Sequence, residues 1–88
     1  MKEFSRIRED NGCFIFDYWA DSDPTGELHN LGAILVESPI PGDSRIESGM
    51  KSNPYCGVAE AKDNTEISAK IIQTQLIERG WIFRNELS

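Results

Sequence analysis

Basic residues, histidine and cysteine are scarce in this chain. Nine lysines and arginines stand against fifteen aspartates and glutamates, which gives a formal charge of −6 at pH 7. This charge disfavours contact with the phosphate backbone of a nucleic acid, and the few basic residues form no stripe along the sequence. We therefore expect no direct binding to nucleic acid, and an acidic surface that suits solubility or a basic protein partner.

Long apolar segments are also absent. No uninterrupted apolar run is longer than that of residues 33–36, which is far shorter than the roughly 20 residues that cross a membrane. Residues 1–5 lead directly into charged residues, without the apolar core of a secretory signal. These features predict no membrane segment and a cytoplasmic protein.

The shortage of histidine and cysteine limits the chemistry that the chain can support. His29 is the only histidine, so any pairing of a cysteine nucleophile with an imidazole base must use it. Neither Cys13 nor Cys56 lies in an activating sequence context, and both are expected to be small buried thiols. Zinc would need ligands from carboxylates or from a second copy. The sequence therefore predicts no catalytic residue, no metal site and no cofactor, and leaves open whether the two cysteines pair.

One acidic segment, residues 21–27, resembles the opening of an EF-hand calcium loop. Oxygen-bearing side chains occupy its first, third and fifth positions, and glycine occupies the sixth. The twelfth position requires a bidentate glutamate but holds Gly32, and the flanking segments have the composition of strands. The segment is therefore expected to be an acidic loop and not a calcium site.

What the chain does contain predicts an α+β fold in one compact domain, residues 1–88. Asn11-Gly12 is the preferred pair for a two-residue hairpin turn. The returning segment 13–19 is apolar on both faces, which is typical of a central strand. The preceding segment 2–9 carries few apolar residues and is predicted to be an edge strand.

The middle of the chain is predicted to hold a second hairpin and a long loop. Residues 27–37 have the composition of a strand, with Gly32 marking a bulge, and the turn-forming segment before them would connect it to the strand 13–19. Residues 38–54 are rich in proline and glycine and are expected to be mostly loop, with one helical turn near 44–50. A short strand is predicted over residues 55–61.

The C-terminal quarter predicts the main helix, over about residues 64–79, with a capping pair at Asp63 and Glu66. Gly80 ends this helix, and a strand is predicted over residues 81–85. The expected architecture is a small antiparallel sheet of four to five strands, with this one main helix packed on one face.

Helical periodicity predicts a single broad buried face on this helix. Ile67 and Ile71 lie on one side of that face, and Ile72 on the other. Ser68 and Gln75 fall between the two apolar rows. These two polar residues are predicted either to bond inside the fold or to leave part of the helix open to a partner.

Size and charge favour a small acidic protein-binding module over an enzyme. By analogy with bacterial immunity proteins and antitoxins, such a module would inhibit a basic partner such as a nuclease toxin. The predicted contacts are the acidic loop, two aromatic anchors next to it, and the long middle loop. The acidic loop contributes Asp21, Asp23 and Glu27, the aromatic anchors are Tyr18 and Trp19, and the long middle loop contributes Asp43, Glu47 and Tyr55.

Two other functions are also compatible with the sequence. One is a regulatory subunit or small enzyme that binds a metabolite between the sheet and the loop 38–54, because loops of about seventeen residues often serve function. The other is a structural domain that dimerises through a sheet edge. The sequence does not decide between a monomer and a homodimer.

Overall fold

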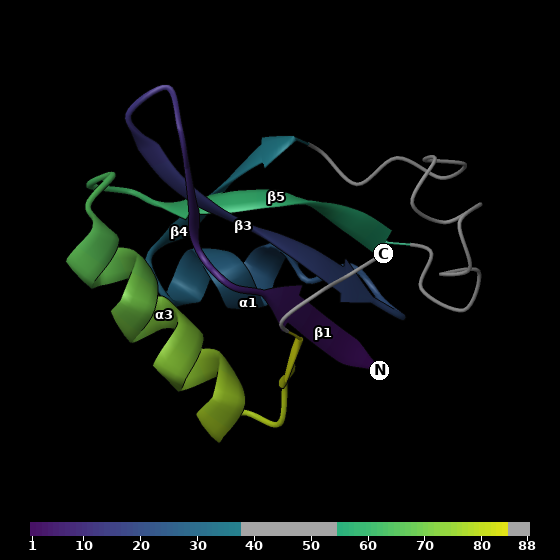
Figure 1. Ribbon diagram of the computed structural model, residues 1–88. Coiled ribbons are helices and arrows are strands. Elements are labelled where there is room, and N and C mark those ends of the chain that lie inside the picture. Colours follow the sequence, from purple (N-terminus) through teal and green to yellow (C-terminus); the bar gives the residue numbers. More distant parts are fainter. Residues whose placement is uncertain (38–54, 85–88) are drawn as a thin grey trace.

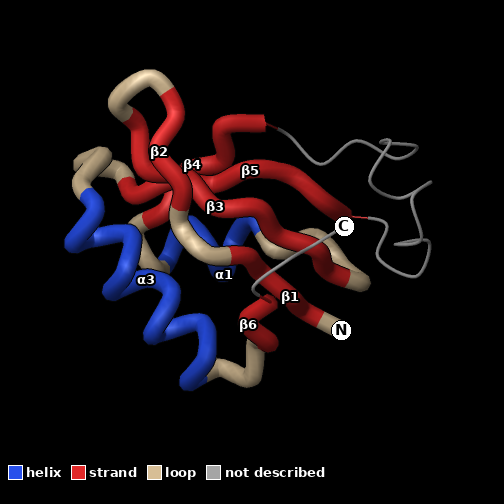
Figure 2. Tube along the Cα trace, in the orientation of Figure 1, coloured by secondary structure: helices blue, strands red, loops and turns tan. Residues whose placement is uncertain are grey.

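The computed structural model describes residues 1–37 and 55–84, which form one sheet and two helices (Figures 1 and 2). In chain order the elements are β1 (Lys2–Ser5), β2 (Arg8–Asp10), β3 (Cys13–Ala20), α1 (Thr25–Asn30), β4 (Ala33–Glu37), β5 (Tyr55–Ala61), α3 (Glu66–Glu78) and β6 (Ile82–Arg84). The predicted helical turn near 44–50 lies outside the described residues.

The strands of the described residues form a sheet in the order β4-β5-β3-β1-β6, and β2 extends it by pairing with β3. The pairs are antiparallel except for β6, which runs parallel to β1. Both helices cover the same face of this sheet (Figure 1). The α+β class is therefore confirmed, with a mixed sheet in place of the purely antiparallel one expected.

The first predicted hairpin is confirmed. Asn11 and Gly12 have φ angles of 53° and 83°, the positive values that a two-residue turn of this type requires, and Asp10 pairs with Cys13 on either side of it. The returning strand β3 is central, because β5 pairs along one edge while β1 and β2 pair along the other.

The prediction of residues 2–9 as one edge strand is wrong. The segment divides into β1 and β2, and β1 lies inside the sheet between β3 and β6. The division occurs at Ser5, whose hydroxyl accepts a hydrogen bond from the Asp17 backbone N–H at 2.9 Å and donates to the Arg6 carbonyl at 3.2 Å. A side chain thus occupies a position that a backbone carbonyl would take in a continuous ladder.

The strand predicted over residues 27–37 is also wrong in its first half. Residues 25–30 form the helix α1, and β4 starts only at Ala33. Asp23 accepts hydrogen bonds from the Thr25 backbone N–H and hydroxyl, at 3.0 and 2.6 Å, and Pro24 occupies the N-cap position of this helix. Gly32, predicted to mark a bulge, instead follows the helix with a φ of 92°.

The second hairpin does not form as predicted, because β4 pairs with β5 and not with β3. With α1 between them, β3 and β4 are separated by a whole helix that packs its buried Leu28 on the sheet. The short strand predicted over residues 55–61 is confirmed as β5, and it separates β4 from β3 in the sheet.

The main helix is confirmed within two residues at each end. Thr65 caps α3 by accepting a hydrogen bond from the Ser68 backbone N–H at 3.2 Å. After the last turn, Gly80 has a φ of 92° and the Trp81 backbone N–H bonds to the Leu76 carbonyl at 3.0 Å, which reverses the chain into β6.

The core lies between the sheet and the two helices. It is built from aromatic side chains on β1 and β3 and from small side chains on β4 and β5, which let the helices approach closely. Its buried members are Phe4, Phe16, Tyr18, Ala20, Leu28, Ala33, Ala59, Ala61, Ala69, Ile72, Leu76 and Trp81.

One polar contact fixes α1 relative to the end of α3. Glu27 Oε1 accepts hydrogen bonds from Lys2 Nζ at 2.8 Å and from the Trp81 indole Nε1 at 3.1 Å. This carboxylate therefore joins β1, α1 and the turn before β6.

Candidate functional site

The helix α3 carries more apolar side chains than the described fold buries. Its buried row consists of Ala69, Ile72 and Leu76, whereas Ile67 and Ile71 remain 73% and 53% exposed. Residues four apart on a helix are neighbours on its surface, so these two isoleucines form a continuous aliphatic strip. We call them the isoleucine pair.

The prediction of one broad buried face is therefore wrong for the isoleucine pair. Leu76 lies at the centre of the buried row. Ser68 and Gln75 lie at the margin of this row and are half-buried. The isoleucine pair lies beyond that margin. The helix packs chiefly on β5, and also contacts β3 and β6, through its buried row alone.

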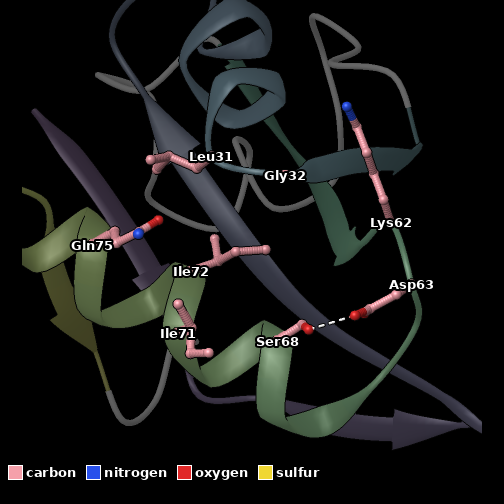
Figure 3. Close-up of a pocket in the computed structure, with 8 residues that line it drawn as sticks. All are labelled: Leu31, Gly32, Lys62, Asp63, Ser68, Ile71, Ile72 and Gln75. Atoms are coloured by element: carbon pink, nitrogen blue, oxygen red, sulfur yellow. Dashed lines mark hydrogen bonds between the residues drawn. The ribbon is translucent and has the colours of Figure 1, made fainter.

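A groove of about 280 Å³ runs beside this strip, between α3 and the segment that joins α1 to β4 (Figure 3). We call it the α3 groove. Its apolar walls come from both elements, and its polar groups come from α3 and from the turn before α3. The lining residues are Leu31, Gly32, Lys62, Asp63, Ser68, Ile71, Ile72 and Gln75.

Asp63 supplies the negative charge at one end of the α3 groove. Its Oδ2 accepts a hydrogen bond from the Ser68 hydroxyl at 2.6 Å, and its Oδ1 accepts from the Thr65 backbone N–H and hydroxyl, both at 3.1 Å. The bond from Ser68 is the main cause of a pKa below the usual aspartate value, with the bonds from Thr65 adding to it. The side chain is therefore fully ionised at neutral pH.

Gln75 and Lys62 supply the other polar groups of the groove. Among the described residues, the Gln75 amide makes no side-chain hydrogen bond and the Lys62 ammonium makes no ion pair. In Figure 3 the Lys62 side chain extends away from Asp63 and from α3. Of the two polar residues singled out from the sequence, Ser68 is thus bonded inside the fold, whereas Gln75 is available to a ligand.

Further carboxylates lie at the same end of the molecule. The turn before α3 contacts the first hairpin, because Asn64 Oδ1 accepts a hydrogen bond from the Phe14 backbone N–H at 3.3 Å. That hairpin carries Glu9 and Asp10, both exposed and without an ion pair in the described part of the chain. Glu66 makes only a long contact to Lys70, at 3.9 Å. The acidic end of the α3 groove therefore faces solvent with several unneutralised charges nearby.

A second groove, of about 360 Å³, follows the other flank of α3. It lies between α3 and the strands β1 and β6, next to Ile77 and Phe83, which are 54% and 40% exposed. Among the described residues that line it, Lys70 alone is charged. An acidic chain that binds a basic partner has the matching charge at the α3 groove and not here.

The predicted acidic contacts lie at the opposite end of α1 from the α3 groove, and each is engaged within the fold. Asp21 pairs with the amino group of Met1. Asp23 holds the start of α1, and the hydrogen bonds from Thr25 lower the pKa of its carboxyl. Glu27 is the carboxylate that joins Lys2 and Trp81.

The predicted aromatic anchors are not exposed. Tyr18 and Trp19 are 0% and 1% accessible, and both lie on β3, the central strand of the sheet. Tyr55 is half-buried and packs against the core. Asp43 and Glu47 lie outside the described residues. The sequence reasoning therefore missed the α3 groove, although the two polar residues between apolar rows of α3 were its signal.

The residues weighed for catalysis are not brought together. His29 is exposed on α1, Cys56 is buried in β5, and Cys13 is half-buried beside Asn64. No disulfide joins the two cysteines. Within residues 1–37 and 55–84, no group of three or more histidine, cysteine, aspartate or glutamate side chains is arranged to hold a metal ion.

Comparison with protein-family models, with curated proteins and with solved structures finds no match for this chain. In the part of the chain that the structure describes, no helix is long and apolar enough to cross a membrane.

Proposed function

We propose that this chain is a small acidic protein-binding module that inhibits a basic protein partner in the cytoplasm, in the manner of an immunity protein or antitoxin. The observation that carries the proposal is the isoleucine pair, exposed beside the α3 groove at the acidic end of the molecule. The partner-binding surface in this proposal is α3 with its groove.

The isoleucine pair supplies the apolar centre of this surface. Single exposed apolar residues are common, but two large aliphatic side chains in helical register beside a groove are typical of an interaction face. Burying them against a partner would recover roughly 1.5–3 kcal/mol for each side chain that becomes fully covered. Energetic hot spots of interfaces have this arrangement, with an apolar centre and a polar margin.

The carboxylates supply charge around that centre. Asp63 lines the groove, Glu66 starts α3, Glu9 and Asp10 lie on the hairpin that contacts the turn before α3, and the net charge of the whole chain is −6. A field of this sign accelerates encounter with a basic protein and repels acidic ones, while the apolar centre sets the lifetime of the complex. Asp21 and Asp23 add to the same field from the far end of α1.

Affinity capture with a pair of matched variants tests the proposal. The immobilised chain should retain a basic protein from its native lysate at low salt and release it as salt is raised. The variant Ile67→Ser/Ile71→Ser should lose that protein, whereas Ile77→Ser, which changes an equally exposed isoleucine on the other flank, should retain it.

Two results would count against the proposal. Retention of the same protein by the Ile67→Ser/Ile71→Ser variant would remove α3 and its groove from the interface. A retained partner that is acidic, or whose binding is insensitive to salt, would contradict the role of charge.

A further inference from the structure

We propose that the α3 groove receives one arginine side chain of the partner, with its aliphatic stem between Leu31 and α3 and its guanidinium at Asp63. This inference rests on the proposed function, since it names the chemical group by which a basic partner is recognised. It requires three properties of the groove: apolar walls, an anion at one end and a free polar group at the other.

The walls fit an aliphatic stem. Leu31 approaches from the end of α1, and Ile71 and Ile72 line the groove from α3 (Figure 3). Arginine buries its methylene groups along apolar surface while its charged head remains at a polar or wet boundary. A purely apolar side chain would also fill the walls, but it would leave the charge of Asp63 without a counterion and the Gln75 amide without a hydrogen-bond partner.

The length of the groove also fits. Ser68 and Gln75 are seven residues apart on α3, which corresponds to about 10 Å along the helix axis. An extended arginine side chain and its own backbone amide together cover such a span. The guanidinium can therefore reach the Asp63 end while the backbone of the same residue remains at the Gln75 end.

Asp63 has accepting capacity left for the guanidinium. Its Oδ2 is engaged by one hydrogen bond, from Ser68, and a carboxylate oxygen accepts two. The planar guanidinium offers several N–H donors in a fixed fork and is more weakly hydrated than an ammonium, so it is better suited than lysine to a partly apolar groove.

Gln75 has both a donor and an acceptor free. Its amide makes no side-chain hydrogen bond within the described residues, and it lies at the margin of the buried row of α3. An amide side chain can bond to both the N–H and the C=O of a peptide unit. It therefore suits the backbone of the incoming residue better than its charged end.

Lys62 opposes this arrangement and so provides a test of it. Lys62 is one of the residues that line the groove and makes no ion pair among the described residues, so its positive charge repels an incoming guanidinium even though the side chain extends away from Asp63 (Figure 3). Removing this charge with Lys62→Met should strengthen arginine binding. An anionic ligand would instead be weakened by the same change.

Nuclear magnetic resonance titration of the full chain provides the experiment, with acetyl-Gly-Arg-Gly-amide as the probe. The probe should cause saturable shifts at the backbone amides of Gly32, Asp63 and Gln75. Acetyl-Gly-Leu-Gly-amide and acetyl-Gly-Glu-Gly-amide should bind more weakly at these positions. Lys62→Met should strengthen binding of the arginine probe about twofold or more, and Asp63→Asn should weaken it about threefold or more, the range of a partly exposed ion pair.

Asp23→Asn is the matched control. Asp23 and Asp63 each hold a threonine two residues later at the start of a helix, so both variants remove one charge from the same local turn. Only Asp63 lines the groove, and Asp23→Asn should leave arginine binding unchanged. Should Asp63→Asn disturb the start of α3, Gln75→Ala provides a second variant at the other end of the groove and should also weaken binding.

Shifts confined to the Glu9 and Asp10 hairpin, shifts spread evenly over surface carboxylates, or stronger binding of the glutamate probe would each overturn the inference. These failures are distinguishable from failure of the proposed function. A partner that is captured through the isoleucine pair while the arginine probe does not enter the groove contradicts this inference alone.

Discussion

Asp63 accepts two hydrogen bonds from Thr65, one from the backbone N–H and one from the hydroxyl, both at 3.1 Å. The same relationship joins Asp23 to Thr25 at the start of α1. Each aspartate thus stabilises the first turn of a helix with an ionised side chain. The two turns differ in one respect that bears on function, since Asp63 lines the α3 groove and Asp23 does not.

Stability should fall in acid as these aspartates are protonated. Hydrogen bonds lower the pKa of both carboxyls in the folded chain. The stability that these carboxylates contribute is therefore fully present above their unfolded-state pKa, about 3.9 for aspartate. It is lost as the pH falls through the lower pKa of the folded chain. Urea unfolding at pH 6 and pH 3 should show Asp63→Asn to be less stable than the wild type at pH 6, with the difference narrowing at pH 3. A difference in unfolding free energy that stays constant from pH 6 to pH 3 would contradict the lowered pKa of Asp63.

Alanine substitutions at Gly80 and Gly26 should change the stability of the chain in opposite directions. Gly80 has a φ of 92°, so Gly80→Ala should destabilise the chain by about 1 kcal/mol through backbone strain alone, because a Cβ there would meet no atom within 4 Å. Gly26 is also free of close neighbours but lies inside α1 without a positive φ. Gly26→Ala should stabilise by about 0.5–1 kcal/mol. Thermal unfolding of the two variants checks the pair, and a shift of the same sign in both would refute it.

Alanine substitutions at Ile71 and Ile72 should differ sharply in their effect on stability, although the two residues are adjacent in sequence. Ile72 is 3% exposed in the core, so Ile72→Ala should cost about 2–5 kcal/mol. Ile71 is 53% exposed, and Ile71→Ala should change the unfolding free energy by about 0.5 kcal/mol or less while weakening partner binding. Denaturant titration of both variants measures the contrast. Equal losses would place Ile71 in the core and remove it from the interface.

The two acidic ends of the chain should differ in their effect on association rate. Glu9→Gln/Asp10→Asn neutralises charges next to the α3 groove and should slow association with the partner about threefold to tenfold at low salt. Asp21→Asn/Asp23→Asn removes the same charge from the far end of α1 and should slow association less. Stopped-flow kinetics at two salt concentrations compares them, and the reverse order would move the interface to the loop at Asp21 and Asp23.

The sequence predicted the elements with the strongest local signals. Asn11-Gly12 specified its hairpin because both positions need positive φ, and Gly80 marked the end of α3 for the same reason. The helix α1 was missed because its six residues carry a single buried side chain, Leu28, which cannot show a helical period. Its start signal, Asp23-Pro24-Thr25, has the same composition as a turn.

The groove was less predictable than the fold. Helical periodicity locates an apolar face on α3, but the part of it that is buried depends on which strands lie beneath the helix. That arrangement depends in turn on β4 pairing with β5, a contact that local sequence does not encode. The sequence could thus indicate Ser68 and Gln75 as unusual, but not that the isoleucine pair would lie outside the core.

Mapping the complex tests the central claim most directly. The captured partner is added to the isotopically labelled chain, and protection of backbone amides from hydrogen exchange is compared between the free and bound states. The account predicts new protection along α3 from Ile67 to Gln75 and at Leu31 and Gly32. Protection confined to the loop at Asp21 to Glu27, or to the other flank of α3 at Ile77 and Phe83, would contradict it.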